Sequence, residues 1–208
     1  MKTPPKQSPP GKASATGTGQ VRIIGGQWRG TKLPVVDVPG LRPSSDRVRE
    51  TVFNWLQPVL PGARVLDLFA GSGAFGLEAV SRGAREAHLV ERDARAHQCL
   101  QASVERLQAR HAVHLHRADA IAWLRAPLHG RFDVVFMDPP FAAGLWDDAL
   151  ALLPPWLAGD AWLYLESPSK DPPTAGPVPG PPGWTLHREG RTREVRYALF
   201  RGRDPGTG

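Results

Sequence analysis

Short apolar runs alternate with amphipathic segments along most of the chain. The apolar runs predict strands at 64–69, 87–91, 113–116, 132–137 and 161–166. Segments with helical spacing of their apolar residues lie between them, at 74–82, 94–110, 119–125 and 145–153. Strands that alternate with helices through short connections form right-handed crossovers. The pattern therefore predicts an α/β fold, with a mostly parallel central sheet and helices on both of its faces.

Further elements are expected before the alternating region. Residues 21–24 and 32–36 predict two short strands that could form a hairpin. A helix is expected from about Asp46 to Gln57, because Ser45 can cap its first turn and Pro58 stops it.

After the alternating region, residues 184–187 and 194–201 predict two strands joined by a short turn near Gly190. The expected boundaries are a disordered basic tail at 1–20, an N-terminal extension at 21–60, the α/β domain at 61–203 and a short tail at 204–208.

Composition narrows the class of protein. The 208 residues are 41% hydrophobic and 22% charged, which suits one domain with appendages. Many of the 22 Pro and 22 Gly residues lie at 1–20 and 171–183. The sequence holds no apolar run of about 18 residues and no apolar signal-peptide region, so a cytoplasmic protein without a membrane partner is expected. The single cysteine, Cys99, excludes an internal disulfide and a cysteine-based zinc cluster, and no metal is expected.

Charge is concentrated at the two ends of the chain. The net charge is +6, and residues 1–50 alone hold nine Lys and Arg against three acidic residues. Residues 184–203 hold a second excess, of six Arg over two Glu. Basic segments beside a neutral body favour a polyanionic partner, because neutralised phosphates release counterions. A general preference for arginine gives the same charge, so this argument alone favours nucleic acid only slightly.

The first chemical motif follows the strand at 64–69. Residues 67–73 read DLFAGSG, and the glycines at 71, 73 and 76 satisfy the G-x-G-x-x-G pattern of dinucleotide-binding loops. Glu91, 20 residues after Gly71, can accept hydrogen bonds from both hydroxyls of a ribose. The function of a nicotinamide-dependent enzyme is therefore one that this motif allows. Asp67 is unfavourable beside a pyrophosphate but suits the cationic ammonium of S-adenosylmethionine.

A second motif, Asp138-Pro139-Pro140-Phe141, directly follows the apolar strand at 132–137. Ligands of open α/β sheets bind beyond the carboxyl ends of the strands, where this segment falls. Asp138 and the carbonyl of Pro139 can then accept hydrogen bonds from a substrate amine, and Phe141 offers a flat surface to a base. A rigid turn with a capping Asp is the structural alternative. Asp119, after the strand at 113–116, could bind an adenine amino group or cap a helix.

Together, DLFAGSG, Glu91, Asp119 and DPPF resemble the class I S-adenosylmethionine-dependent amino methyltransferases. Longer segments resemble the RsmD family: VRIIGGQWRG at 21–30, LRPSSDRVRETVFNWL at 41–56, FGLEAVSRGA at 75–84 and FDVVFMDPPF at 132–141. The resemblance implies a class I methyltransferase Rossmann-like fold. It also implies methylation of the N2 amine of one guanine in 16S ribosomal RNA, within a small-subunit particle. A monomer is expected.

The resemblance also implies roles for individual residues. The methionine part of the cofactor would be surrounded by Asp67, Phe69, Ala70, Gly71, Ser72 and Gly73, the ribose held by Glu91, and the adenine by Asp119 and Ala120. Asp138, Pro139, Pro140 and Phe141 would form the catalytic motif. The RNA would be held by Arg22, Trp28, Arg29, Lys32, Arg42, Arg47 and Arg49. Ser103 departs from the family, which usually has Asn at this position on the adenine side.

Several other functions stay open or are disfavoured. Adenine N6 and a protein glutamine are the near alternatives, since both would present an amine to the same DPPF site. Pyrimidine C5 methylation needs a thiol nucleophile, and Cys99 lies outside every motif. A non-catalytic RNA-binding protein with a degenerate core predicts eroded motifs, and neither DLFAGSG nor DPPF is eroded.

Overall fold

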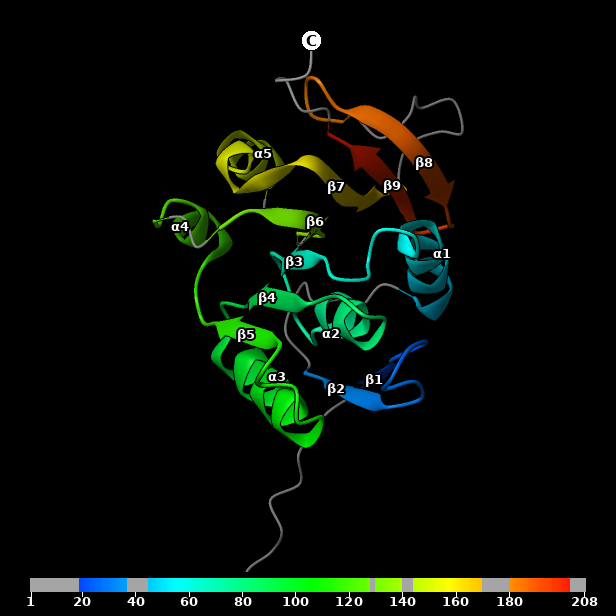
Figure 1. Cartoon of the computed structure of the whole chain (residues 1–208), viewed down its shortest axis with the longest axis vertical. Coiled ribbons are helices and arrows are strands. Elements are labelled where there is room, and N and C mark those ends of the chain that lie inside the picture. Colours follow the sequence, from blue (N-terminus) through cyan, green and yellow to red (C-terminus); the bar gives the residue numbers. More distant parts are fainter. Residues whose placement is uncertain (1–18, 37–44, 128–129, 140–143, 170–179, 203–208) are drawn as a thin grey trace, which may run out of the picture.

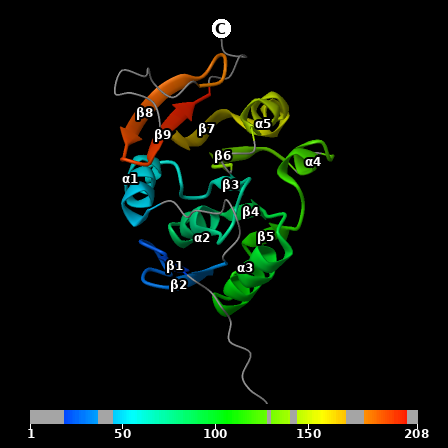
Figure 2. The same ribbon diagram turned by 180° about the vertical axis from the view of Figure 1, so that it is seen from behind.

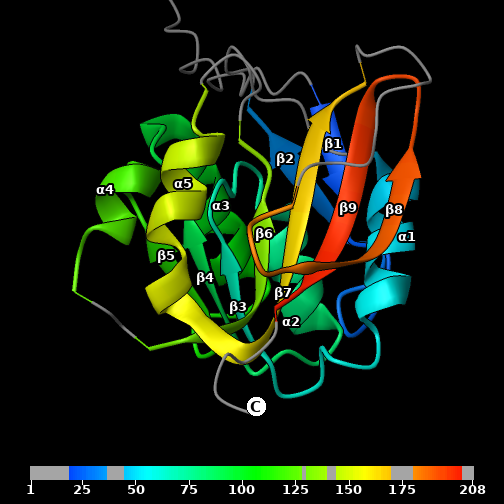
Figure 3. The ribbon, with the colours of Figure 1, turned by 90° about the horizontal axis from the view of Figure 1, so that it is seen from above.

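The computed structural model describes residues 19–36, 45–127, 130–139, 144–169 and 180–202. Its centre is a seven-stranded sheet in the order β5-β4-β3-β6-β7-β9-β8. The strands are β3 (Arg64–Asp67), β4 (Glu86–Val90), β5 (Val113–His116), β6 (Phe132–Met137), β7 (Leu157–Pro168), β8 (Thr185–Arg191) and β9 (Val195–Arg201). The first five of these run parallel, and β9 is antiparallel to both of its neighbours. Figure 3 shows β7 and β9 running side by side in opposite directions.

Helices cover both faces of this sheet, as Figure 1 and its reverse view in Figure 2 show. One face carries α1 (Asp46–Leu56), α2 (Ala74–Ser81) and α3 (Ala94–Arg106). The other carries α4 (Ala120–Leu124), α5 (Trp146–Leu152) and the 3₁₀ turn Pro154–Trp156. Each face buries its own apolar core cluster, so the predicted α/β architecture is confirmed.

The strand order reverses between β3 and β6, which lie side by side in the sheet. The chain leaves β3 toward β4 and β5, then crosses back to β6 and β7. Connections on the two sides of such a reversal depart in opposite directions, which leaves a crevice at the carboxyl ends of the two central strands. Both chemical motifs of the sequence follow those two strands.

The N-terminal extension packs into the same core as the sheet. Strands β1 (Gly19–Arg22) and β2 (Lys32–Val35) form an antiparallel hairpin, as predicted, and it lies beside α2 and α3 in Figure 1. Val21, Ile23 and Leu33 are buried in the core cluster beneath α1 and α2. Ser45 caps α1 by accepting a hydrogen bond from the Val48 amide at 3.3 Å. The hairpin and α1 are therefore part of one folded body with the α/β region.

Several expected boundaries were wrong. Gly19 and Gln20 belong to β1 and not to the predicted tail, whose residues 1–18 lie outside the described residues. The helix expected to reach Arg110 ends at Arg106, and Gln108 takes a positive φ of 55°. The C-terminal turn follows Arg191 and does not lie at Gly190.

Gly190 lies inside β8, and the ring beside it explains why this position of the strand is a glycine. A Cβ atom at this position would lie 2.3 Å from the ring of Tyr197 on the paired strand β9. The glycine therefore makes room for an aromatic side chain and does not mark a turn.

No helix in the described part of the chain is long and apolar enough to cross a membrane.

Candidate active site at the carboxyl ends of the strands

Acidic residues lie at the carboxyl ends of four adjacent strands, β4, β3, β6 and β7. Asp67 is the last residue of β3, Glu91 directly follows β4, and Asp138 directly follows β6. Glu166 lies near the end of β7. Because these strands are parallel neighbours, their carboxyl ends meet at one edge of the sheet. The structure thus brings the predicted Asp67, Glu91 and Asp138 to one acidic edge.

The loop after β3 is folded tightly. The Ala70 amide donates to the Val90 carbonyl at 2.9 Å, and the Gly73 amide donates to the Ala70 carbonyl at 2.7 Å. Gly71 and Gly73 have φ values of 52° and 76°, in the left-handed region that favours glycine. The loop then leads into α2, for which Gly73 is the N-cap.

Two glycines of the motif are also required by packing. A Cβ atom at Gly73 would lie 2.4 Å from the Leu100 side chain, and one at Gly76 would lie 2.6 Å from the Leu89 side chain. They let α2 pack closely on β4 and α3. Part of the G-x-G-x-x-G pattern is therefore explained by the fold before any ligand is considered.

Asp67 is a buried carboxylate with 3% of its surface exposed. Its Oδ2 accepts a hydrogen bond from the Gly76 amide at 2.9 Å. Burial raises the pKa of this carboxyl from 3.8 to about 7, the Gly76 hydrogen bond lowers it, and the negative charge of Glu91 raises it further. A cation placed beside Asp67 would offset that cost of burial.

Glu91 holds the loop after β3 in place. Its Oε2 accepts from the Gly71 amide at 2.8 Å, and its Oε1 accepts from the Asp93 amide at 2.7 Å. A carboxylate offers about four lone-pair sites, so each oxygen can still accept from a ligand hydroxyl. The residue expected to bind a ribose therefore also joins the ends of β3 and β4.

Asp119 is the N-cap of α4. Its Oδ1 accepts from the amides of Ile121 and Ala122 at 3.0 and 3.1 Å, and the residue is exposed. The capping role, one of the two alternatives from the sequence, is thus present in the structure. Ala120 is buried behind it. The remaining predicted cofactor residues lie in the loop after β3, where Ala70 is buried and Phe69 and Ser72 are half-buried.

Asp138 is half-buried and Pro139 is buried, at the end of β6. Pro140 and Phe141 lie outside the described residues. On the neighbouring strand β7, the Tyr164 hydroxyl donates to Glu166 Oε2 at 2.6 Å, and both residues are buried. Burial and the negative charges of Glu166 and Asp138 raise the pKa of Tyr164 well above its usual range.

The sequence analysis missed Tyr164 and Glu166. The signal that could have found Glu166 is the one used for the other acids, namely an acidic residue at the carboxyl end of an apolar strand. The hydrogen bond between Tyr164 and Glu166 could not be found from that signal, because it depends on which face of β7 is buried in the core.

The predicted RNA-binding side chains divide into two groups. Arg22, Arg29, Lys32 and Arg47 are exposed on the hairpin and α1, and Arg22 pairs with Asp46 at 3.2 Å. Trp28 is half-buried and packs against the core cluster. Arg42 lies outside the described residues. Arg106 of α3, which the sequence analysis did not include, is exposed and donates to the Lys32 carbonyl at 2.6 Å.

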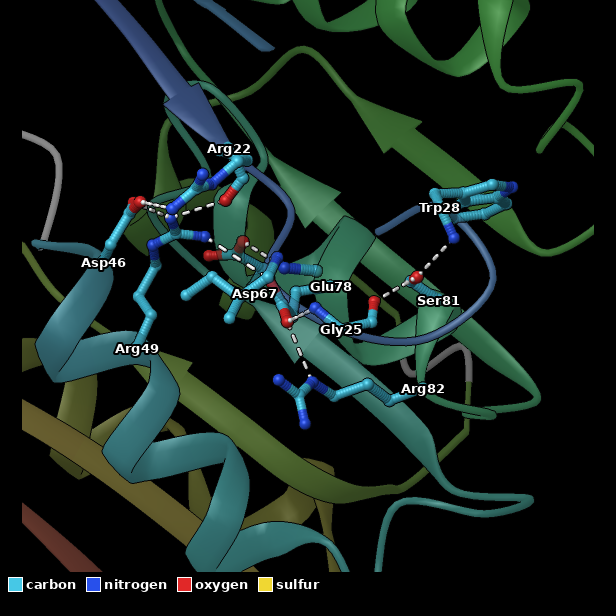
Figure 4. Close-up of polar contacts among 11 residues, drawn as sticks. Arg22, Gly25, Trp28, Asp46, Arg49, Asp67, Glu78, Ser81 and Arg82 are labelled. Carbon is cyan, nitrogen blue, oxygen red and sulfur yellow. Dashed lines mark hydrogen bonds and ion pairs between the residues drawn. The ribbon is translucent and has the colours of Figure 1, made fainter. Parts of the chain in front are cut away.

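Arg49 corrects the prediction, because its side chain has no exposed surface and cannot reach RNA directly. It donates to the Arg22 carbonyl at 2.7 Å and to Asp46 Oδ1 at 2.6 Å (Figure 4). Its other terminal nitrogen lies 3.5 Å from Glu78 Oε2. Arg49 shares the helical spacing of Val52 and Leu56 on the buried face of α1, but spacing alone does not show that a carboxylate of α2 lies opposite it.

Glu78 is the centre of that network. This fully buried side chain of α2 accepts from the amides of Ile24 and Gly25 at 2.7 and 2.8 Å. It also accepts from Arg82 Nε at 2.8 Å, one turn along the helix. Figure 4 shows these groups converging on α2 from the hairpin connection and from α1. The N-terminal extension is thereby fixed to the helix that follows the glycine loop.

The side chains at the acidic edge fit S-adenosylmethionine. Asp67 and Glu91 are buried at either side of the glycine loop, so they suit a ligand with a cationic ammonium and sulfonium. A dinucleotide could also use Glu91 for a ribose, but it would place its negative pyrophosphate at the glycine loop beside the buried Asp67. The donor set therefore favours S-adenosylmethionine over a nicotinamide cofactor.

Comparisons with known proteins agree with this reading. The family model described as "Conserved hypothetical protein 95" matches residues 21–201. The chain is 47% identical to ribosomal RNA small subunit methyltransferase D of Escherichia coli K12, over 91% of this chain and 93% of that protein. The protein of the same name from Haemophilus influenzae is 41% identical, over 88% of this chain and 94% of that protein.

Solved structures also resemble the model. A structure from E. coli that is described as a methyltransferase has a TM-score of 0.78 and 46% identity, covering 89% of this chain and 99% of that one. A methylase structure from H. influenzae has a TM-score of 0.74 and 36% identity, with the same coverage. The match of the family model over nearly the whole described region, together with these relatives, shows that the chain belongs to the RsmD family.

Proposed function

We propose that this protein transfers the methyl group of S-adenosylmethionine to the exocyclic N2 amine of a guanine in 16S ribosomal RNA. The observation that carries the proposal is Asp138, which directly follows β6, the strand beside β3, whose last residue is the buried Asp67. The names of the relatives support a ribosomal RNA of the small subunit as the substrate. The choice of guanine N2 rests on the family resemblance of the DPPF motif.

The residues that would hold the cofactor belong to three strand ends. Asp67 would accept from the ammonium of the methionine part, with Phe69 to Gly73 around it. Glu91 would accept from the ribose hydroxyls through lone pairs that its backbone contacts leave free. The free carboxylate oxygen of Asp119 would face the adenine amino group. When bound, the cofactor supplies an electrophilic methyl group on its sulfonium.

Asp138 and the Pro139 carbonyl would orient the substrate amine. The lone pair of a guanine N2 amine is delocalised into the ring, which makes it a poor nucleophile. Two acceptors can bind its hydrogens and turn the lone pair toward the methyl carbon, and such positioning accounts for much of the rate of a bimolecular reaction. As the N–C bond forms, the S–C bond breaks, and Asp138 takes the proton that the amine releases.

The target base must leave its stack to reach Asp138, which costs a few kcal/mol. Contacts to the RNA backbone supply binding energy against that cost. The exposed cations of the hairpin and α1 are suited to this role, whereas Arg49 is not, because it is buried. Phe141 would stack on the extruded base.

The test is transfer of a labelled methyl group to small ribosomal subunits that lack the modification, followed by analysis of the nucleosides. We expect label in N2-methylguanosine with the wild type, and at least about a 100-fold lower rate with Asp138→Ala. Asp148→Ala is the matched control, because Asp148 is an exposed acid at the start of α5. Label in N6-methyladenosine would move the substrate to adenine. Label in ribosomal protein with none in RNA would refute an RNA substrate.

A further inference from the structure

A histidine cluster lies on strands β4 and β5, at one edge of the sheet. Glu86 and His88 belong to β4, and His114 and His116 belong to β5. Side chains at every second position of a strand point to the same face. The register pairs His88 with His114, and so the four side chains gather on one face of the sheet.

The donor atoms of this cluster lie close together. One nitrogen or oxygen from each of Glu86, His88 and His114 lies within 4.8 Å of the others. Glu86 Oε2 and His114 Nε2 are 3.7 Å apart. Four ligands around a tetrahedral zinc, with bonds of about 2.0–2.1 Å, are separated by roughly 3.4 Å. The spacing of the donors is therefore within a small side-chain adjustment of a metal site.

Neighbouring residues orient these donors as an outer shell does in metal proteins. Arg64 Nε forms a hydrogen bond with Glu86 Oε1, so the other oxygen, Oε2, is the one that faces His114. A terminal nitrogen of Arg64 also donates to the Arg131 carbonyl at 2.9 Å. His116 Nε2 lies 3.1 Å from His88 Nδ1 and fixes the plane of that ring.

Packing holds the rings but leaves one side open to solvent. His88 is 8% exposed and its ring meets the edge of Phe132, with ring centroids 5.1 Å apart. His116 lies against Trp123, with ring centroids 5.2 Å apart. The side chain of His114 is 43% exposed, so an ion can enter from that side.

Two features make this cluster unlike an ordinary polar surface. Both faces of a parallel sheet are usually covered by apolar residues, yet here imidazoles occupy the positions that would carry them. Glu86 and His114 also lie toward the amino ends of their strands, since Glu86 begins β4 and is paired with Arg64, which begins β3, whereas His116 is the last residue of β5. Methyl transfer at the carboxyl ends leaves these residues without a role.

We propose that Glu86, His88 and His114 bind one divalent transition-metal ion of the zinc class, with His116 as a positioning residue for His88. Imidazole nitrogens and a carboxylate oxygen suit zinc and its neighbours in the transition series. The ion would join the edge strand β5 to β4, with its fourth position open on the exposed side of His114. This goes against the sequence expectation of no metal, which rested on the cysteine count alone.

The experiment uses the full chain without an affinity tag, treated with a chelator and then titrated with Zn²⁺ or Co²⁺. We expect one equivalent of metal per chain, a rise in Tm, and with Co²⁺ the visible absorption of a four-coordinate ion. His114→Ala should weaken binding by more than about 100-fold, and His116→Ala by roughly 10–100-fold, as outer-shell changes do. All readouts are independent of methyl transfer.

His111→Ala is the matched control, because His111 is an exposed histidine just before β5 and outside the cluster. It should bind metal as the wild type does. Equal binding by the wild type and His114→Ala would overturn the proposal, as would the absence of any saturable binding. Circular dichroism without metal shows whether each variant folds. Because the side chain of His114 is partly exposed, we expect His114→Ala to fold, so that weaker metal binding by this variant reports the loss of a ligand.

Discussion

Asp67 shows how one buried side chain can link the fold to its chemistry. Its carboxyl is almost without solvent contact, and a single backbone amide lies against its Oδ2. Keeping a charge there is costly in the free protein, which is why burial raises the pKa to about 7. The same burial that makes an unpaired carboxylate unfavourable strengthens its attraction for a bound ammonium.

This predicts a pH dependence of stability that Asp67→Asn removes. The folded-state pKa of about 7 lies above the ordinary value of 3.8, so the native state binds the proton more tightly than the unfolded chain. The contribution of Asp67 to the free energy of unfolding is therefore largest below about pH 4 and is lost as the pH rises to about 7. The full loss is on the order of 4 kcal/mol, from a shift of about three pH units. Asparagine keeps an oxygen for the Gly76 amide and does not titrate.

Urea unfolding of the wild type and Asp67→Asn between pH 4 and 8 measures the effect. The variant should gain stability relative to the wild type as the pH rises through this window. Asp148→Asn on the surface of α5 is the control and should track the wild type at every pH. A difference between wild type and Asp67→Asn that does not change with pH would contradict the prediction.

At the scale of elements, Glu78 joins three segments that are far apart in the sequence. It accepts hydrogen bonds from the hairpin connection at Ile24 and Gly25, and its charge meets Arg49 of α1 and Arg82 of its own helix (Figure 4). The helix that carries Glu78 begins at the glycine loop. Placement of the N-terminal extension and placement of the loop therefore depend on the same helix.

Glu78→Gln should lower the free energy of unfolding by about 3–5 kcal/mol, because Arg82 loses the carboxylate that it contacts and the buried Arg49 is left with Asp46. Glu105→Gln is the matched control, since Glu105 pairs with Arg110 in solvent near the end of α3 and its loss should leave stability close to that of the wild type. Urea unfolding measures both variants. Hydrogen exchange should also show lost protection at the Ile24 and Gly25 amides in Glu78→Gln alone. Equal effects of the two substitutions would show that the buried network is not needed.

At the scale of the whole molecule, the exposed cations of the hairpin and α1 are carried by the same folded body as the acidic edge. The proposed RNA contact depends on charges that reach solvent. Its strength should follow salt in the way that phosphate neutralisation requires. The net charge of +6 counts exposed and buried cations alike. Arg49 contributes to this charge, but its buried side chain adds nothing to the surface that RNA can contact.

The double variant Arg29→Ala/Lys32→Ala should weaken binding to small-subunit RNA and reduce the slope of log K against log salt. Each lost phosphate contact removes about 0.7–0.9 from that slope. Arg110→Ala is the control, because Arg110 is exposed but already paired with Glu105. Filter binding at several salt concentrations measures the slopes. An unchanged slope in the double variant would place the RNA on another surface.

The order of strands and helices, the cap at Ser45, and the acidic residues at the ends of β3, β4 and β6 were all predictable from the sequence. These features are local, because each depends on the spacing of apolar residues or on a few neighbouring positions. The membership in the RsmD family was likewise visible in contiguous segments such as LRPSSDRVRE. A match over such a contiguous segment can be made without the contacts that the segment forms in the folded protein.

Other features were decided only by the tertiary structure. Arg49 has the spacing of the buried face of α1, but its charge can lie there because Glu78 faces it from another helix. Gly190 has the composition of a turn and lies in a strand because the Tyr197 ring covers it. His88 and His114 are 26 positions apart in the chain and meet only through the parallel register of β4 and β5. The contacts of Arg49 and of the histidines join distant segments, and the contact of Gly190 depends on the register of a hairpin, so local spacing carries no information about which side chains will share a buried space.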